Sequence, residues 1–448
     1  MRVTDSASIN QYISNNHSTL SAYLDKFNKV LTQQKFNRAS EDSVSANSAM
    51  RIRKQLENLN MYDTNLQNAS DIFTAAETSL YYVSGTLYNN VNQKLVSIQS
   101  TKGDVEFEAI GNEIMQQAEA MVKALNVDSG GRQLLAGTSN NKEPFTYKYY
   151  LTDENGNFTY YETENVQKTD ASGNLIFTDV NGDTVLGHDD GAGNMLYEYE
   201  DGTALTDAAM IANLTAVTED VYKTYADDVV DAEGNVIHKK GDYIETTEGA
   251  AGAKLMEAGE NDTLKNMRAI VYYNDQDVTR HSDKASEYNG AGGIFIDVGY
   301  GIKYDSNGNV VPTTAMDIAL NGAEYTGCGV DDSDDKEDSN NMVQLAFDAA
   351  RAAYNGDLET CNRLIDKLSA AQKTMLEGIT GLGVKQNNIE FHLSKDTDYR
   401  MNLQEKQNEV ECVDLTEVIT QLEAAQASYN AALRLGSQAV PQSIFNFI

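Results

Sequence analysis

Both ends of the chain carry long runs of apolar residues at heptad spacing, and these runs restrict the fold more than any other feature. Near the N-terminus, apolar or semi-polar residues recur at Ile13, His17, Leu20, Leu24, Phe27 and Leu31. A longer series follows at Leu59, Tyr62, Leu66, Ala69, Phe73, Ala76, Leu80, Val83 and Leu87. The same spacing returns near the C-terminus at Leu364, Leu368, Ala371 and Met375, and again at Leu415, Val418, Leu422, Ala425, Tyr429 and Ala432. Narrow apolar seams of this kind are typical of long helices that pack on partner helices.

Local signals divide these seams into helices. Ser40 or Asp42 is suited to cap the second helix, since either side chain can accept hydrogen bonds from free backbone amides. A third helix is predicted over 104–126, before the paired Gly130 and Gly131. Gly381 and Gly383 are expected to interrupt the returning helix. We expect the helices of the two termini to pack on each other, which makes the middle of the chain an insertion.

Charge separates the ends from the middle. The chain of 448 residues has 68 Asp and Glu against 34 Lys and Arg, a net charge of -34. Residues 1–150 have a net charge of -1 and residues 341–448 of -5, so residues 151–340 have a net charge of -28. Such an acidic surface repels phosphate backbones and anionic lipid headgroups, so we expect neither nucleic-acid nor membrane binding.

The middle has the composition of hairpins. Short turns rich in Asp, Asn and Gly recur beside β-forming residues, at 153–157, 170–174, 179–183, 231–235 and 305–309. We predict a β-rich region with possible helices at 204–215 and 250–259, and a solvated acidic linker at 331–338. The predicted fold class is therefore α+β, a long antiparallel helical or coiled-coil bundle formed by both termini with an inserted β-rich acidic domain. The expected domains are an N-terminal axial helix (1–40), a helical part (41–144), the acidic insert (145–338), a returning helical part (339–405) and a C-terminal axial helix (406–448).

Residues suited to catalysis are sparse. Asp179, Asn181 and Asp183 alternate as calcium ligands do, but the glycine and the final glutamate of a calcium loop are missing, which favours plain turns. The five histidines are scattered, and no glycine cluster has a nucleotide-binding pattern. Cys328, Cys361 and Cys412 are expected to be buried small hydrophobes. The sequence thus predicts no metal, no cofactor and no catalytic site.

Three segments resemble the flagellin family. Residues 36–46 (FNRASEDSVSA) are similar to the N-R-P-S-D-D-P-x-x-A loop of flagellin-type proteins, with Ala39 and Ser43 in place of the prolines. Residues 130–138 (GGRQLLAGT), followed by Pro144 and Phe145, resemble a stretch of the hook-filament junction proteins, the hook-associated protein 3 group. Residues 413–448 are similar to the flagellin C-terminus, although Pro441 interrupts it. The resemblance covers about 1–146 and 341–448, and the acidic insert lies outside it.

The resemblance implies a structural subunit of the bacterial flagellum that joins hook to filament by head-to-tail helical assembly. It implies self-assembly, hook-associated protein 1 and flagellin as axial partners, an export chaperone, and export by flagellar type III secretion to an extracellular location. The first residues do not form a cleavable leader, which agrees with this expectation. Filament flagellin, or a flagellin-like surface protein with an adhesive or catalytic insert, remains the alternative.

On this basis we predict an assembly interface made by terminal residues. Its expected members are Leu20, Leu24, Phe27, Leu31, Arg38, Asp42, Leu422, Ala425 and Tyr429. Leu66, Phe73, Leu80 and Leu87 are expected to form a longer seam in the next layer. Each of these residues is equally suited to an intramolecular core, because a seam residue serves either purpose.

Overall fold

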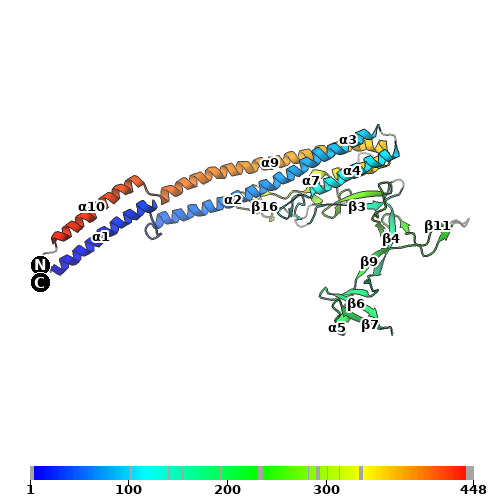
Figure 1. The fold of residues 1–448 in the computed structure, drawn as a ribbon, viewed down its shortest axis with the longest axis horizontal. Helices are drawn as coiled ribbons and strands as arrows, with labels where there is room; N and C mark the ends of the chain where they lie inside the picture. The colour runs from blue at the N-terminus through cyan, green and yellow to red at the C-terminus, as the bar shows by residue number, and fades with distance from the viewer. Residues whose placement is uncertain are drawn as a thin grey trace. The chain divides into compact units, whose positions relative to one another are not determined.

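The computed structural model describes residues 5–439, except 101–102, 140–141, 154–155, 192–193, 231–235, 281, 289–292, 300, 312 and 332–335. The chain has the predicted α+β fold, with long helices from both termini and a β-rich central region (Figure 1). It divides into two compact units. Unit 1 comprises Met1–Ala75, Gly292–Ala319 and Thr380–Ile448, and unit 2 comprises Ala76–Ala291 and Leu320–Ile379.

Unit 1 is built on two antiparallel helix pairs. The first pair is α1 (Asp5–Thr32) with α10 (Leu415–Ala439). The second pair is the first part of α2 (Ser43–Tyr81) with the last part of α9 (Leu358–Glu411). The ion pairs and hydrogen bonds Arg53–Glu411, Asp63–Arg400 and Thr74–Gln386 join α2 to α9 in opposite sequence order, which fixes the antiparallel direction. A short hairpin, β16 (Phe295–Asp297) with β17 (Ala315–Asp317), completes the unit.

The predicted seams form the core of these helices. Leu66, Phe73, Leu80 and Leu87 are buried, so within one chain they fill the intramolecular core. The helix that carries them continues from α2 through a π-helical turn, η1 (Tyr82–Leu87), into α3 (Tyr88–Ile98). The expected interruption at Gly381 and Gly383 was wrong, because α9 runs through both glycines without a break. Ile379 and Leu382 are buried on either side of Gly381, and their packing outweighs the weak helix propensity of glycine.

Asp42 is the cap of α2. Its Oδ1 accepts hydrogen bonds from the backbone amides of Val44 at 3.2 Å and Ser45 at 3.0 Å. Hydrogen bonds from the hydroxyl and the amide of Ser45 lower the pKa of Asp42. The cap therefore stabilises the helix above the ordinary pKa of aspartate, and this contribution fades as the pH falls through the lower pKa of the folded state.

Replacing Asp42 with alanine is expected to lower the free energy of unfolding of unit 1, because two amides at the start of α2 lose their acceptor. Ser40→Ala is the matched control, and it should change the free energy of unfolding by less than about 0.5 kcal/mol. Urea unfolding followed by far-ultraviolet circular dichroism measures both. Equal losses in the two variants would contradict the assignment of the cap.

Unit 2 packs two helices on a small sheet. Helix α4 (Asp104–Leu125) ends close to the predicted residue and lies against α8 (Met342–Tyr354). The helices approach closely, because a side chain at Gly111 would collide with the backbone of Tyr354. The sheet has the order β15-β14-β3. Its strands are β3 (Phe145–Leu151), β14 (Met267–Tyr273) and β15 (Gln276–Asp277).

A glutamine of α8 covers an open edge of this sheet. Strand β15 pairs with Tyr272 and Tyr273 of β14, and in the described part of the chain no strand pairs with β14 beyond them on that side. The buried side chain of Gln344 occupies that place. Its Oε1 accepts from the amide of Val271 at 2.9 Å, and its Nε2 donates to the carbonyl of Ala269 at 2.9 Å. One amide side chain thus satisfies a donor and an acceptor that would otherwise be buried without partners.

The acidic part of unit 2 is β-rich, as predicted. Strand β4 (Tyr160–Gln167) pairs with β9 (Thr218–Tyr222), β12 (Glu245–Thr246) and β13 (Ala253–Leu255). A second sheet has the order β7-β6-β5-β8, made of β5 (Leu175–Thr178), β6 (Thr184–Asp189), β7 (Met195–Tyr199) and β8 (Thr215–Ala216). The predicted helix at 250–259 was wrong, since that segment contains β13. The helix at 204–215 is reduced to α5 (Ala208–Ile211).

The remaining elements of unit 2 are short. They are β1 (Asp128–Ser129), β2 (Arg132–Gln133), β10 (Val229–Val230), β11 (Val236–His238), α6 (Ala285–Tyr288) and α7 (Gly322–Thr326). Gly130 and Gly131 join β1 to β2 with φ of 63° and 83°, a backbone conformation that glycine adopts readily. The two glycines therefore form a hairpin turn after the helix has ended at Leu125.

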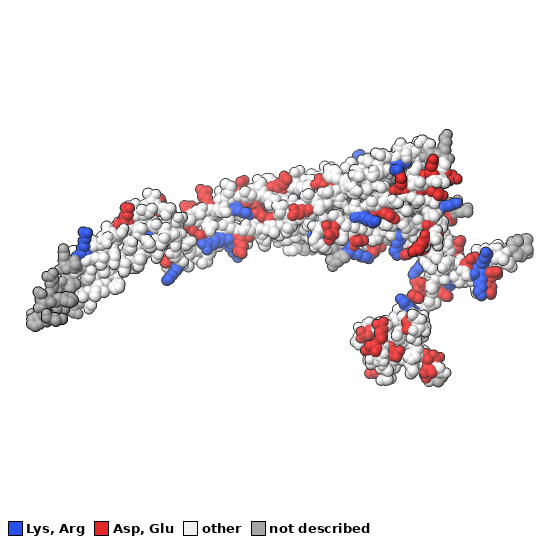
Figure 2. All heavy atoms as spheres, viewed as in Figure 1, with Lys and Arg blue, Asp and Glu red and all other residues white. Residues whose placement is uncertain are grey.

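Aspartates hold the turns of the acidic part. Asp170 accepts hydrogen bonds from the amides of Ser172 and Asn174, both at 2.8 Å. Asp179 accepts from the amides of Asn181 and Asp183 in the same way, which confirms the turn interpretation of this segment. Between residues 169 and 222 the sequence has eleven Asp or Glu and no Lys or Arg. Figure 2 shows acidic side chains gathered over β6 and β7.

The ends of the predicted acidic linker are fixed to a helix. Asp338 forms a two-point ion pair with Arg363 of α9, with N–O distances of 2.7 and 3.1 Å, and Asp331 pairs with Lys367. Val330 and Ser339 form an isolated β-bridge. The expectation of a solvated linker was therefore wrong at both ends, because basic residues one helical turn apart on α9 neutralise these aspartates. Residues 332–335 lie outside the described part of the chain.

Candidate assembly surface

The two terminal helices meet along one face of each. On α10 the less exposed positions include Val418, Leu422, Ala425, Tyr429 and Ala432, which repeat in heptad steps. On α1 the less exposed positions include Tyr12, Asn16, Thr19, Tyr23, Lys26 and Val30. Tyr23 stacks on Tyr429 with ring centroids 6.2 Å apart and an interplanar angle of 9°. The ring of Tyr12 lies against Gly436, which has no side chain to obstruct it.

Most of the predicted residues of α1 lie outside this contact. Leu24 is 46% exposed, Phe27 41% and Leu31 66%, although all three are large and apolar. Leu20 is half-buried and borders them. We call Ile13, Leu24, Phe27 and Leu31 the outer stripe of α1. The helix pair therefore buries one face of α1 and leaves a second, more apolar face in contact with water.

The predicted residues of α10 lie on its inner face. Leu422, Ala425 and Tyr429 are half-buried towards α1. Leu415, Ile419 and Leu433 of the same helix are exposed. Each terminal helix thus has an apolar face for its partner within the chain and further apolar residues that the described residues leave exposed. The assembly role of these residues stays a prediction, as does that of the outer stripe.

The loop between α1 and α2 is fastened to the end of α9. Gln33 has a positive φ of 56°, and its carbonyl accepts from the amide of Val413 at 3.1 Å. The amide of Lys35 donates to the carbonyl of Glu411 at 2.7 Å. Arg53 forms a two-point ion pair with the carboxylate of Glu411, with both N–O distances at 2.9 Å. These contacts hold the connection between the terminal helix pair and the rest of unit 1.

Arg38 and Asp42 have different positions in this loop. Asp42 is committed to the cap of α2, whereas Glu41 accepts from the amide of Asn37 at 2.9 Å. Arg38 is exposed, and its side chain has no hydrogen bond or ion pair with the described residues. Its guanidinium is exposed to solvent, and its role in assembly stays a prediction.

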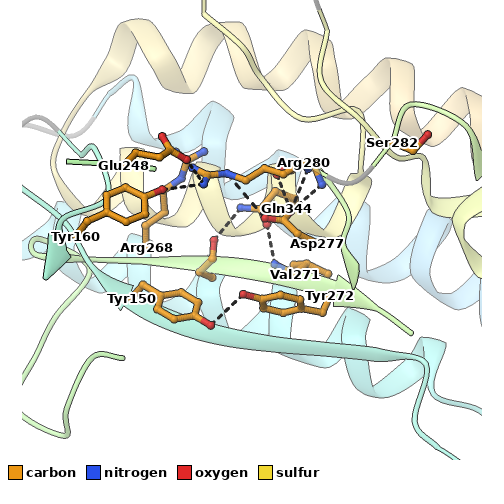
Figure 3. A network of polar contacts seen from close by, with 12 residues as sticks. Tyr150, Tyr160, Glu248, Arg268, Val271, Tyr272, Asp277, Arg280, Ser282 and Gln344 are labelled. Carbon is orange, nitrogen blue, oxygen red and sulfur yellow. Dashed lines mark hydrogen bonds and ion pairs between the residues drawn. The ribbon is translucent and has the colours of Figure 1, made fainter. Parts of the chain in front are cut away.

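Unit 2 contains a network of polar side chains that pair with one another (Figure 3). Arg280 donates to the hydroxyl of Tyr160 and to Glu248, both at 2.8 Å. The guanidinium groups of Arg268 and Arg280 lie 5.3 and 5.4 Å from the centre of the Phe158 ring. Burial raises the pKa of Tyr160, which keeps its hydroxyl protonated. The network joins the sheets of unit 2 through these contacts.

The cysteines are unlike one another. All three are free, with Cys328 and Cys361 buried and Cys412 exposed, so the expectation of burial was wrong for Cys412. Burial raises the pKa of Cys328 to about 11 and that of Cys361 to about 12. Among the described residues no cluster of His, Cys, Asp and Glu is suited to hold a metal ion. No described helix is long and apolar enough to cross a bilayer.

Iodoacetamide is expected to alkylate Cys412 rapidly in the folded chain and to leave Cys328 and Cys361 unmodified until the chain unfolds, because only a thiolate that is accessible reacts. Because the pKa values of Cys328 and Cys361 are raised in the folded chain, the two neutral thiols contribute fully to stability below the pKa of a free thiol. This contribution is lost as the pH rises towards 12. Mass spectrometry of peptides after timed alkylation measures the three rates. Equal rates, or continued fast labelling in Cys412→Ala, would contradict the assignment.

The heptad spacing predicts the seams but does not show which face of α1 meets α10. Tyr12, Tyr23 and Val30 form an apolar series of their own beside the outer stripe, interrupted by Asn16 and Lys26. The spacing of this series matches the spacing of the residues on the inner face of α10, and this was the signal available in the sequence. Gln344, which completes the sheet edge, has no signal in the sequence, because an isolated glutamine in an amphipathic helix is ordinary.

Comparison with known proteins gives matches to solved structures. No protein-family model and no curated protein sequence matches the chain. The structure is similar to flagellar hook-associated protein 3 from Legionella pneumophila, with 9% identity, a TM-score of 0.34, and coverage of 81% of this chain and 98% of the other. It is similar to the flagellar junction protein FlgL from Legionella pneumophila, with 10% identity, a TM-score of 0.30, and coverage of 76% and 99%. FlgL of Xanthomonas campestris has 13% identity, a TM-score of 0.28, and coverage of 74% and 92%.

Proposed function

We propose that the chain is a structural subunit of the bacterial flagellum that joins hook to filament. Three separate segments of the sequence, at 36–46, 130–138 and 413–448, support this proposal through their resemblance to the flagellin family. The observation that carries it is the outer stripe of α1, an apolar surface that the folded chain leaves in water. Exposed apolar surface of this kind is typical of a site for association.

The outer stripe and the inner face of α1 point in different directions around one helix. A helix with two such faces can bind α10 of its own chain and, at the same time, a terminal helix of another copy. Because the two surfaces in that second contact differ, the contact is heterologous, and repeating it builds an open helical tube instead of a closed dimer. Arg38, free in the loop, and the exposed Leu415 and Ile419 of α10 would lie in the same interface.

The acidic insert is assigned to the outside of the tube. Its net charge of -28 over residues 151–340 would produce strong repulsion if neighbouring copies packed these segments closely. The ends, with net charges of -1 and -5, can pack densely along an axis. This distribution supports the five-part division into axial helices at 1–40 and 406–448, helical parts at 41–144 and 339–405, and an insert at 145–338.

The proposed partners are further copies of the chain, hook-associated protein 1 on the hook side and flagellin on the filament side, with a chaperone before export. The proposed location is outside the cell, reached by flagellar type III secretion. We assign no enzymatic activity and no cofactor to the chain.

The position of the protein in the flagellum tests this proposal. Immunogold electron microscopy with an antibody against the full chain should label a short zone where the filament meets the hook. Cells that lack the chain should carry hooks without filaments and release flagellin into the medium, and the wild-type chain should restore filaments. Labelling along the whole filament would indicate a flagellin instead, and labelling of the cell surface alone would contradict a flagellar role.

A further inference from the structure

Unit 2 has a cleft with a basic lining in an otherwise acidic chain. The cleft has a volume of about 850 Å³ and is lined by the second half of α8, the start of α9 and loop residues that include Asp153, Gly156 and Lys265. Its cationic residues are Lys265, Arg268, Lys336, Arg351 and Arg363. The carboxylates that line it are Asp153, Asp338, Asp348 and Asp357. A net positive lining is unexpected in a chain with a net charge of -34.

Two of the carboxylates are committed to arginines. Asp348 binds Arg268 through two hydrogen bonds of 2.7 and 3.0 Å, and Asp338 binds Arg363 through two of 2.7 and 3.1 Å. A two-point pair uses both oxygens of the carboxylate and leaves little capacity for another cation.

The other two carboxylates hold backbone. Asp153 accepts from the amide of Asn157 at 2.8 Å and from its side chain at 3.2 Å. Asp357 accepts from the amide of Thr360 at 3.1 Å, at the start of α9. Every carboxylate of the cleft therefore already holds an arginine or the backbone, and none of them forms an ion pair with Lys265 or Arg351 among the described residues.

Arg351 forms no ion pair with the described residues. Its one hydrogen bond goes from Nη2 to the hydroxyl of Thr152 at 3.5 Å, the limit for such a bond. Its Nε is buried and has no partner among the described residues, and no described carboxylate lies within ion-pair distance. Burial and the neighbouring Arg268 lower the pKa of Arg351. Lys265, on the facing loop, also has no ion pair with the described residues.

The loop opposite Arg351 leaves space for its guanidinium. Gly156 has a φ of 87°, and a side chain at that position would collide with the Nη1, Cζ and Nη2 atoms of Arg351. Glycine therefore serves both the turn and the close approach of the arginine. The guanidinium is held at the cleft with unsatisfied donors, in a place where burial makes an uncompensated charge unfavourable.

We propose that this cleft binds a carboxylate-bearing anion through Arg351, with Lys265 as a second contact. A carboxylate matches the planar fork of a guanidinium and supplies the acceptors and the negative charge that the cleft lacks. The carboxylate belongs to a free polycarboxylate or to an acidic side chain of a second copy, such as one from the acid-only segment 169–222. The proposal does not depend on the flagellar role.

Thermal unfolding of the full chain tests the site with citrate as the probe, against sodium chloride at equal ionic strength. Citrate at millimolar concentration should raise the melting temperature of the wild type by about 2 °C or more. Arg351→Met keeps the length of the side chain and removes the charge, so it should abolish this rise. Lys265→Gln should reduce the rise, and Lys123→Gln, which removes an exposed charge on α4, should leave it unchanged.

The same variants separate a binding role from a structural one. Without citrate, Arg351→Met should melt at or above the temperature of the wild type, because it removes an uncompensated charge. Sedimentation at low salt tests the second source: self-association that is lost in Arg351→Met but kept in Lys123→Gln places the carboxylate on another copy. A melting temperature of Arg351→Met several degrees lower without citrate would overturn the proposal, as would a wild type that shows neither a citrate response nor Arg351-dependent association.

Discussion

Replacing Leu24 with aspartate should abolish assembly while leaving the free chain folded. Leu24 is half exposed in the single chain, so a charged group there remains hydrated and costs little stability. In the proposed assembly the same side chain is buried between copies, and desolvating a carboxylate at that contact costs about 3 kcal/mol or more. Because each copy carries the change, we expect roughly a 100-fold or greater loss of affinity at every contact. Filament formation in cells and the circular dichroism of the purified variant measure the two effects.

Val180→Asp is the matched control for this change. Val180 is 67% exposed and lies in a turn of the acidic part, where a further carboxylate stays in solvent. It should leave assembly and stability unchanged. If Leu24→Asp cells still complete filaments, the outer stripe is not an assembly surface. If the variant is unfolded, the exposed position of Leu24 is contradicted, because a charged side chain in solvent would not unfold the chain.

Replacing Gln344 with methionine should destabilise unit 2 by about 3 kcal/mol. Methionine has a similar length, so the packing of α8 is largely kept, but the amide of Val271 and the carbonyl of Ala269 lose their partners in a buried place. Leaving a buried polar group unsatisfied costs about 1–3 kcal/mol, and this change leaves two. The free energy of unfolding in urea, followed by tyrosine fluorescence, measures the loss.

Gln404→Met is the control, since Gln404 is exposed on α9 in unit 1. Its effect should stay within about 0.5 kcal/mol. Hydrogen exchange gives a second and more local readout, because the amide of Val271 should exchange faster in Gln344→Met, while amides of β14 that bond to β3 keep their protection. Unchanged protection of Val271 would contradict the role given to Gln344.

The helices could be predicted because their residues follow one period. Leu66, Phe73 and Leu80 recur at heptad spacing and are all buried, as a helix that packs along another helix requires. The turns could also be predicted from the sequence. In each turn an aspartate accepts hydrogen bonds from the amides two and four residues later, and a glycine follows the aspartate. These residues specify the conformation of the turn. Local rules were sufficient wherever the structure depends on neighbours in sequence.

The errors arose where distant residues decide the outcome. Gly381 and Gly383 were expected to interrupt α9, but buried neighbours hold the helix. Asp331 and Asp338 were expected to lie in solvent, but they pair with Lys367 and Arg363. A short stretch of sequence does not contain the partner in either case, so propensity and charge density alone mislead there.

The assembly surface is a mixed case. The sequence placed an apolar stripe on α1 and another on α10, and Leu422, Ala425 and Tyr429 do face α1 in the chain. It did not reveal that Tyr23 rather than Leu24 meets Tyr429, because two apolar series one position apart satisfy the same heptad rule. Arg351 could not be identified from the sequence either, because only the structure shows that the carboxylates around it already bind other groups.

The most direct test of the proposed function is the accessibility of the outer stripe before and after assembly. A Leu24→Cys chain in a Cys412→Ser background places one accessible thiol on that stripe, since Cys328 and Cys361 are buried. Maleimide should label it readily in the free chain and label it at least about tenfold more slowly in assembled flagella, because a second copy covers it. Equal labelling in the two states would contradict the claim that the outer stripe of α1 joins one copy to the next.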